Sequence, residues 1–309
     1  MPGSGECDIT MLRRLQTLAA TLVVGLVTAP LVHAGVCATD ATGREVCLDQ
    51  PATRIAALSP GATELVWAAG AGEQVVAVVS FSDYPPGATE VTSVGSHTRL
   101  DLEKLLSLEP DLVIGWVTGN PPEQLETLWE LGLPVFSIEP RNFEAVSTTI
   151  EQLATLAGTE EAGFAEAERF RQGIAELTSE YRDAEPVSVF YQVWDEPLMT
   201  VNDDHLIGKM VTLCGGVNVF GDLDRLVPRI SAEAVIAADP EAILAGGMGE
   251  ENRQWLTRWE SFPGLTASKR GNLFFIPPSL VQRPTPRMLE GSRLFCDKLD
   301  IARTRSEDR

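Results

Sequence analysis

The sequence predicts an α/β protein of two lobes, each with a central, mostly parallel sheet flanked by helices, joined by a single long helix. Two observations predict it. Residues 99–114 align without a gap on residues 229–244, 130 positions later. Short apolar runs also alternate with amphipathic ones on both sides of a long helical stretch, which is typical of parallel sheets covered by helices. A repeat at this interval indicates two similar lobes rather than a solenoid, and two lobes imply a cleft.

Each copy of the repeat predicts one helix followed by one strand. Asp101 and Ser231 are N-cap candidates, and Glu103 and Glu233 follow two residues later. Helix-spaced apolar residues then lead to an acidic residue, a proline and a short apolar run. An N-cap followed by a proline stop is the expected signature of a short helix.

Residues 1–34 resemble a cleaved export signal. A basic start precedes an apolar run at 18–32, which ends in small residues. A membrane anchor is the alternative, but the run is shorter than the roughly 20 apolar residues of a spanning helix. The mature chain would begin near Gly35, the start codon could be that of Met1 or Met11, and we expect a soluble exported protein.

The formal net charge is -20, and the acidic and basic residues of the signal cancel. Such a surface repels nucleic acid and anionic membranes, so we expect no partner of either kind. The excess of acid is interpreted as solubility or adaptation to a saline habitat.

Four cysteines remain after processing, and in an oxidising compartment they allow three pairings. Cys37 and Cys47 flank a plausible hairpin turn, so a bond between them would close a ribbon at 35–50. Cys214 and Cys296 would then pair. A metal site is the alternative, but no two cysteines have the close spacing of zinc ligands.

The N-terminal lobe is expected at 51–142. Its predicted strands and helices follow in chain order: strand 54–58, helix 62–69, strand 75–79, the first repeat helix, strand 112–114, helix 122–131 and strand 135–138.

Linking helices are expected at 143–185, where apolar residues recur among Glu, Arg, Gln and Ala. One helix would end near Gly158 and a longer one would span 160–182.

The C-terminal lobe at 186–302 continues the alternation, and 303–309 is predicted as a polar tail. The elements expected in the C-terminal lobe are strand 187–192, helix 206–214, the second repeat helix, strand 242–245, a helix around 255–259, strand 273–276 and helix 285–299.

Ligands of open α/β sheets gather at the loops that leave the carboxyl ends of strands. Three such loops place a large aromatic residue just past a strand end: Tyr84, Trp116 and Trp194. Aromatic side chains on loops form a flat lining suited to a planar organic ligand. Capping of the core is the alternative for each ring.

Catalytic motifs are missing from the sequence, which has no Gly-x-Ser-x-Gly, His-Glu-x-x-His or phosphate-binding loop. His97 stands near the expected cleft, where it would contact ligand or metal, or simply face solvent. His205 marks a helix start, with Asp203 and Asp204 as capping residues. We therefore predict no enzyme, no catalytic residue, no resident metal and no cofactor.

Glu103 and Glu233 are the most suggestive charges. The helix dipole favours a carboxylate in the first turn, which is a sufficient structural reason for either one. Their equivalent placement in two lobes suggests more, because two exposed acids could meet two basic sites on a pseudo-symmetric partner.

Several segments together resemble a known family. They are Ser80-Phe-Ser-Asp-Tyr-Pro-Pro86, Glu109-Pro-Asp-Leu-Val-Ile114, Cys214-Gly-Gly-Val-Asn-Val-Phe220, and Pro286-Arg287 with Cys296. From about 54 to 299 the chain resembles the periplasmic vitamin B12-binding proteins of ABC importers. These belong to the helical-backbone (class III) substrate-binding proteins, which also serve haem and ferric siderophores.

The resemblance implies roles for individual residues. Glu103 and Glu233 fall on positions that dock onto arginines of the membrane permease subunits, and Cys214 and Cys296 fall on a family disulfide. The ligand-contacting positions matched are Tyr84, Trp116 and Arg283. His97 stands where a tryptophan is expected, Trp194 is one place from an expected phenylalanine, and Ser279 replaces an aspartate.

The leading hypothesis is a monomeric periplasmic protein that binds cobalamin or a related corrinoid and delivers it to a permease. The alternative within the same superfamily is haem or a ferric siderophore, for which His97 leaves room. A secreted metalloenzyme using His97 is a third hypothesis, which the scarcity of histidines disfavours.

Overall fold

The computed structural model describes residues 3, 35–247 and 249–307. The predicted signal peptide lies, apart from Gly3, outside the described residues. Among the helices described, none is both long enough and apolar enough to cross a bilayer.

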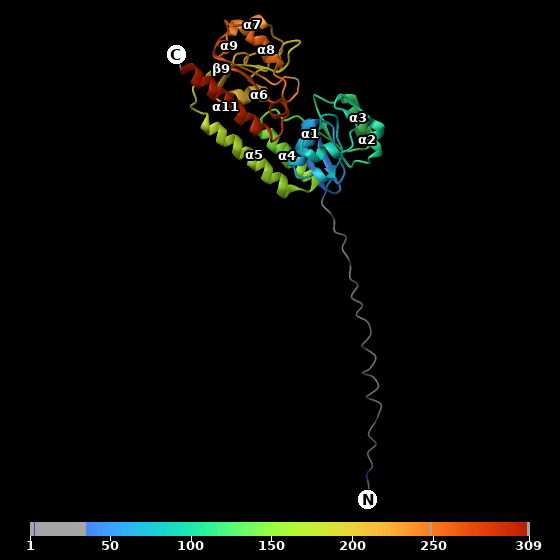
Figure 1. Cartoon of the computed structure of the whole chain (residues 1–309). Helices are drawn as coiled ribbons and strands as arrows, with labels where there is room; N and C mark the ends of the chain where they lie inside the picture. Colours follow the sequence, from blue (N-terminus) through green and yellow to red (C-terminus); the bar gives the residue numbers. More distant parts are fainter. Residues whose placement is uncertain (1–2, 4–34, 248, 308–309) are drawn as a thin grey trace. The chain divides into compact units, whose positions relative to one another are not determined.

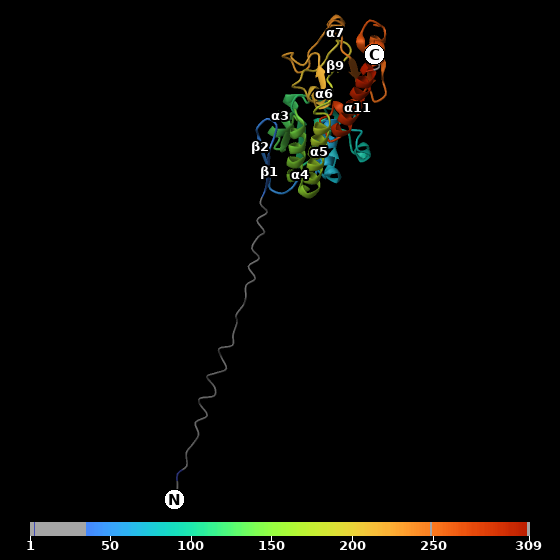
Figure 2. The same cartoon turned by 90° about the vertical axis from the view of Figure 1, so that its left-hand side faces the viewer.

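A disulfide-linked hairpin begins the folded part. Strand β1 (Val36–Thr39) pairs antiparallel with β2 (Glu45–Leu48), and Cys37 and Cys47 are bonded across the pair. The buried Asp40 carboxylate closes the turn by accepting from the backbone N–H of Thr42 at 2.9 Å and of Arg44 at 3.0 Å. The predicted hairpin and its bond are thus present, and β1 packs beside helix α4 (Figure 2).

The N-terminal lobe has a four-stranded parallel sheet with helices on both faces (Figure 1). Side chains alternate between the faces, as strand geometry requires: Ile55 and Ala57 enter one core and Ala56 the other. The strands, in spatial order, are β4 (Val75–Ala77), β3 (Ile55–Ala57), β7 (Leu112–Trp116) and β8 (Val135–Ile138); the helices are α1 (Pro60–Ala68), α2 (Leu102–Ser107) and α3 (Pro122–Glu130). Shorter pieces are η2 (Gly72–Gln74), η3 (Pro86–Glu90) and the pair β5 (Gly95–Ser96) and β6 (Arg99–Leu100).

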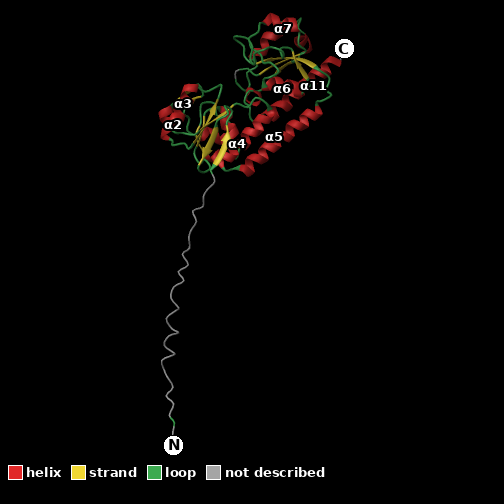
Figure 3. Ribbon diagram, turned by 180° about the vertical axis from the view of Figure 1, so that it is seen from behind, coloured by secondary structure: helices red, strands yellow, loops and turns green. Residues whose placement is uncertain are grey.

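Two helices follow this lobe, as predicted. Helix α4 (Phe143–Ala157) ends at Gly158, whose φ of 69° is a conformation that glycine adopts without strain. Helix α5 (Glu160–Glu180) packs along α4 and α11 (Figure 3). A methyl group at Gly163 would overlap Ala154 of α4, and one at Gly173 would overlap Leu289 of α11. These glycines let α5 approach both neighbours closely.

The C-terminal lobe repeats the layered plan. Its parallel strands, in spatial order, are β10 (Gly216–Asn218), β9 (Val187–Gln192), β11 (Ala242–Ala245) and β12 (Leu273–Phe275); its helices are α6 (Leu206–Leu213), α7 (Ala232–Ala238), α8 (Gln254–Glu260), α9 (Thr266–Arg270), α10 (Pro278–Val281) and α11 (Met288–Glu307). The Cys214–Cys296 disulfide joins the end of α6 to α11. One cluster of buried apolar residues extends from Ile55 through Phe170 of α5 to Tyr191, so the two lobes share a core.

The prediction for this lobe was incomplete in two respects. The sequence did not predict β10, α9 or α10, which are three to five residues long. The polar tail expected at 303–309 is helical through Glu307. Its polar side chains have backbone partners, since Arg303 donates to the carbonyl oxygens of Glu185 at 2.7 Å and Cys214 at 2.6 Å.

The N-terminus of α6 also differs from the prediction. Asp203 and Asp204 do not cap it; the N-cap is His205, whose Nδ1 accepts from the Ile207 N–H at 3.1 Å. Asn202 accepts instead from the N–H groups of Asp204 and His205, both at 3.1 Å. Burial lowers the pKa of His205 to about 4, because a charged imidazole would lose its hydration there.

The sequence repeat is a structural repeat in detail. Asp101 and Ser231 both accept from the backbone N–H three residues on. The residue before each proline is left-handed, with φ of 47° at Glu109 and 42° at Asp239. This conformation turns the chain sharply from helix into strand.

Candidate functional site

A cleft of about 480 Å³ opens between the lobes, within the range of small-molecule sites. It is lined by loops that follow the carboxyl ends of strands of both sheets, as predicted. The lining residues are Ser59, Pro60, Gly61, Phe81, Asp83, His97, Trp116, Ile138, Pro140, Trp194, Gly247, Gly249, Glu250, Trp255, Pro278, Ser279, Gln282, Arg283 and Pro284.

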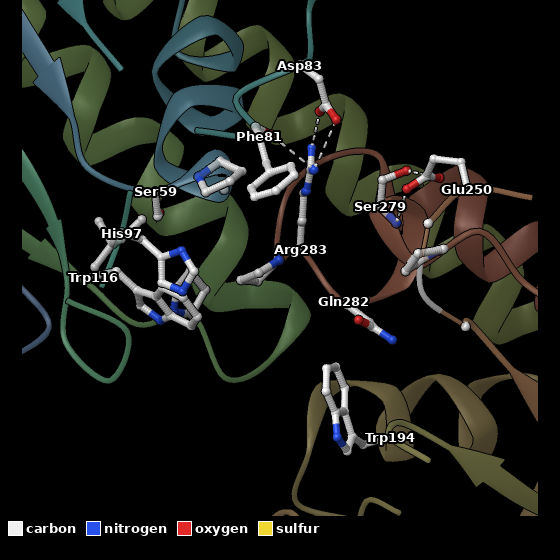
Figure 4. A pocket seen from close by; sticks show the side chains of 18 of the residues that line it. Ser59, Phe81, Asp83, His97, Trp116, Trp194, Glu250, Ser279, Gln282 and Arg283 are labelled. Carbon is white, nitrogen blue, oxygen red and sulfur yellow. Dashed lines mark hydrogen bonds and ion pairs between the residues drawn. The ribbon is translucent and has the colours of Figure 1, made fainter. Parts of the chain in front are cut away.

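The predicted ligand residues do not all meet in this cleft. His97, Trp116, Trp194 and Arg283 line it (Figure 4). Tyr84 lies in a neighbouring depression, where the guanidinium carbon of Arg287 is 4.2 Å from its ring centroid. Its role in ligand binding therefore stays a prediction that the cleft geometry does not favour.

Phe81, in the same loop as Tyr84, faces the cleft instead. Its side chain is 76% exposed and its φ is 68°, a rare conformation for a bulky residue that costs of order 1–3 kcal/mol. Such backbone strain clusters at functional sites. The loop was predicted, but nothing in its sequence distinguishes which of its two aromatic rings turns inward.

Asn120 organises the N-terminal wall. This buried amide accepts from the Trp116 N–H at 2.7 Å and donates to the carbonyl oxygens of Leu58 at 2.9 Å and His97 at 2.8 Å. The rings of His97 and Trp116 lie 5.8 Å apart, tilted by 43°. Three loops are thus held in one arrangement, a role that sequence reasoning missed.

The C-terminal wall carries its own aromatic pair. Trp194 is 42% exposed, and its ring lies 5.8 Å from that of Trp255 in an edge-to-face arrangement. Its indole N–H donates to the carbonyl of Glu196 at 3.0 Å. The exposed face of Trp194 is therefore free to contact a ligand while its polar edge is satisfied.

Arg283 crosses from the C-terminal half of the chain to the N-terminal lobe. Its guanidinium donates to Asp83 at 2.6 Å, to Glu64 at 2.9 Å and to the Phe81 carbonyl at 3.2 Å. Burial by itself would raise the pKa of Asp83, but the hydrogen bond and charge of Arg283 outweigh it and the net pKa is lowered. Arg283 is thus paired with both acids, and Glu64 has a second cationic partner in Arg287.

Glu64, which the sequence placed only within a helix, is the buried centre of this network. Its side chain is 2% exposed. It accepts from Arg283, from the Thr285 hydroxyl at 2.7 Å and from Arg287 at 3.5 Å. A buried carboxylate needs such partners, and these tie α1 to the segment before α11. In the sequence, the only indication of this role was a charged residue inside the apolar run 62–69.

Ser279 and Glu250 form a second polar contact on the C-terminal wall (Figure 4). The Ser279 hydroxyl donates to Glu250 at 2.7 Å and the Ser279 N–H at 3.3 Å. Neither residue was predicted to contact the other, because 29 positions separate them.

The two repeat glutamates lie outside the cleft. Glu103 on α2 and Glu233 on α7 are both exposed, and both helices lie on the side of their lobe away from α5 (Figures 1 and 3). The pKa of Glu233 is lowered by its own N–H and the Ser231 hydroxyl. One turn later, Leu106 and Ile236 are 37% and 39% exposed.

A metal site has little support in the described part of the chain. The one group of three metal-ligating side chains found there is Cys37, Glu45 and Cys47, and its two sulfurs are bonded to each other. His97 is not part of any such group among residues 35–247 and 249–307.

Comparison with known proteins gives consistent matches. The sequence profile of the periplasmic binding protein family matches residues 55–280. The vitamin B12-binding protein of Vibrio cholerae is 35% identical over 252 residues, covering 82% of this chain and 91% of that protein. The vitamin B12-binding protein of Yersinia pestis is 30% identical over 285 residues, covering 92% and 93%.

Solved structures agree on the architecture. The crystal structure of the periplasmic vitamin B12 binding protein BtuF of Vibrio cholerae matches with a TM-score of 0.74 and 35% identity, covering 82% of this chain and 98% of that one. The periplasmic heme-binding protein RhuT of Roseiflexus matches with a TM-score of 0.72 and 27% identity, covering 81% and 98%. These matches confirm the predicted fold class, and the relatives are binding proteins rather than enzymes.

Proposed function

Because the chain belongs to the periplasmic binding protein family, we propose that it captures cobalamin or a related corrinoid in the interlobe cleft and delivers it to an ABC importer. The proteins of this family work with ABC permeases. Relatives named as vitamin B12-binding proteins cover most of the chain, which supports the choice of ligand.

The observation that carries the proposal is the pair of aromatic walls. Phe81, His97 and Trp116 come from one lobe and Trp194 from the other. A planar macrocycle between such walls would bury its faces against aromatic rings, the arrangement that rewards a large flat ligand.

The charge of the cleft favours a corrinoid over haem. Among the described residues that line the cleft, Arg283 is the one arginine or lysine, and its guanidinium is held by Asp83 and Glu64. Haem presents two carboxylates, which need cationic partners when desolvated. A corrinoid instead presents neutral amides at its rim, so it loses nothing by the lack of a free cation.

Haem remains the second candidate because of His97. Its imidazole lies in the cleft, and imidazole is a common axial ligand of haem iron. The similarity to the heme-binding protein RhuT, at 27% identity, also supports haem as a candidate. We place haem second because it does not account for the acidic lining.

Delivery is proposed to use the repeated outer helices. Glu103 and Glu233 would each meet a basic side chain on one of two similar permease subunits, and Leu106 and Ile236 would pack beside them. Equivalent positions on both lobes are what a pseudo-symmetric partner requires. We further propose that residues 1–34 direct export and that the processed protein acts as a monomer.

Calorimetric titration of the processed protein with cyanocobalamin, haemin and a ferric siderophore tests the ligand. We expect one equivalent of cyanocobalamin to bind more tightly than either of the others. No heat with cyanocobalamin together with tight binding of haemin would overturn the proposal in favour of haem.

A further inference from the structure

Glu250 is an acidic residue of the cleft that the proposed function has not used. It lies in the loop after β11, is exposed, and contributes to the lining. Both of its carboxylate oxygens are engaged by Ser279 at the start of α10, one by the N–H and one by the hydroxyl. The carboxylate is therefore held in one place although it belongs to a loop.

Arg287 holds the Ser279 side chain in the orientation that contacts Glu250. Its Nη2 donates to the Ser279 Oγ at 3.2 Å. A guanidinium only donates, so the Ser279 hydroxyl must accept from it and direct its own proton to Glu250. Arg287 is itself held between Tyr84 and Glu64. Ser279 is buried, and the chain of contacts leads from the protein interior to the cleft.

Glu250 differs from the other cleft acid in its lack of a cation. Asp83 is paired with Arg283 at 2.6 Å, whereas none of the ion pairs in the described part of the chain includes Glu250. A carboxylate offers about four lone-pair sites, and Ser279 uses two. The remaining sites can accept from a ligand in the cleft.

We propose that Glu250 selects ligands that present N–H donors and rejects ligands that present carboxylates. On the proposed function, on which this inference rests, the donors are primary amides at the corrin rim. Each amide hydrogen bonded to Glu250 would be charge-assisted and strong. A ligand carboxylate at the same point would face a fixed negative charge that forms no ion pair within the described part of the chain. Glu250 thus defines the substrate class as amidated corrinoids.

The test compares two corrinoids that differ in amidation. Dicyanocobinamide carries amides where dicyanocobyrinic acid carries carboxylates, and both lack the nucleotide. We expect the wild-type protein to bind the first roughly 100-fold more tightly. Glu250→Gln should bind dicyanocobinamide about 10-fold more weakly and dicyanocobyrinic acid more tightly, because a glutamine can donate to a carboxylate.

Two further variants make the result specific. Glu251→Gln removes the same charge from the adjacent exposed residue, which does not line the cleft, and should leave the ratio unchanged. Ser279→Ala removes the hydroxyl that holds Glu250 and should reduce the ratio by a smaller factor than Glu250→Gln. Thermal melts of all three variants establish that each is folded.

The outcomes separate the two proposals. If both corrinoids bind but Glu250→Gln and Glu251→Gln change their ratio equally or not at all, the role of Glu250 is refuted and the corrinoid function stands. If neither corrinoid nor cyanocobalamin binds the wild-type protein, both proposals fail.

Discussion

The two lobes are alike on their outer surface and different at the cleft. On the outside, α2 and α7 have the same capping interaction, the same exposed glutamate and the same left-handed residue before proline. The carboxylates after the prolines are equivalent too. Asp111 accepts from the Thr53 and Arg54 N–H groups at 2.8 and 2.9 Å, and Glu241 from the Ser188 N–H at 3.0 Å.

At the cleft the resemblance ends. The N-terminal wall is mainly aromatic, with Phe81, His97 and Trp116, whereas the C-terminal wall combines Trp194 with the carboxylate of Glu250. A repeated surface suits a partner made of two similar subunits, and two unlike walls suit a ligand with unlike faces. This difference supports the proposal that the repeated surface serves delivery and the cleft serves recognition.

The largest expected effect is on the aromatic walls. Trp116→Ala and Trp194→Ala should each weaken cyanocobalamin binding by about 2–4 kcal/mol, the usual cost of truncating a central aromatic contact. Calorimetry gives the loss. Trp129→Ala on α3, outside the cleft lining, is the matched control. An equal loss there would mean that unfolding, not contact, explains the result.

Charge reversal on the outer helices comes next. Glu103→Arg and Glu233→Arg should each weaken binding to the cognate permease roughly 10-fold, and together roughly 100-fold, because distant sites add. Sedimentation with permease vesicles measures this, with Glu176→Arg on α5 as the control for added charge. A difference of more than several-fold between the two single variants would break the predicted equivalence of the lobes.

Asp111 and Glu241, the carboxylates after the prolines, should contribute equally to the stability of the protein. Asp111→Ala and Glu241→Ala each leave backbone N–H groups without their charged acceptor, which we expect to cost about 1.5–3 kcal/mol of unfolding free energy. Urea titration measures it. Since Glu241 also pairs with Arg270 at 2.9 Å, Arg270→Ala is needed to separate that contribution. A negligible effect at Asp111 alone would show that the two carboxylates do not contribute equally to stability.

His205 should make stability depend on pH. Its pKa is about 4 in the folded protein and about 6.5 when unfolded, so the unfolded chain binds the proton first. The stability that neutral His205 contributes is fully present above pH 6.5 and is lost as the pH falls toward 4. At pH 5 the loss amounts to about 2 kcal/mol of unfolding free energy. His205→Asn keeps an N-cap acceptor and should remove this dependence. A pH profile that is unchanged in His205→Asn would assign it to other groups.

The sequence predicted what local patterns determine. Caps, prolines and apolar periodicity are read over a few residues, so both sheets, α4, α5 and the repeat helices were predicted. The strand β10 contains only one apolar side chain, the exposed Val217, so it lacks the apolar run of the other strands. Helix α11 extends past its apolar residues because Arg303 bonds to backbone that is distant in sequence.

The cleft was predicted as a set of loops with four of its lining side chains, His97, Trp116, Trp194 and Arg283, but without the contacts that hold it together. Which ring of the 80–86 loop turns inward depends on the left-handed backbone at Phe81. The contacts of Glu64 with Arg283 and of Glu250 with Ser279 join residues far apart in the chain. Such contacts depend on tertiary structure, which residue type and spacing do not encode.

Uptake of bound ligand tests the separation of delivery from recognition most directly. The Glu103→Arg/Glu233→Arg double variant, loaded with labelled cyanocobalamin, is added to vesicles that contain the cognate permease and ATP. We predict full loading and almost no uptake, while wild-type protein delivers the label. Uptake equal to that of the wild type, or failure of the variant to load, would contradict the assignment of the repeated helices to delivery.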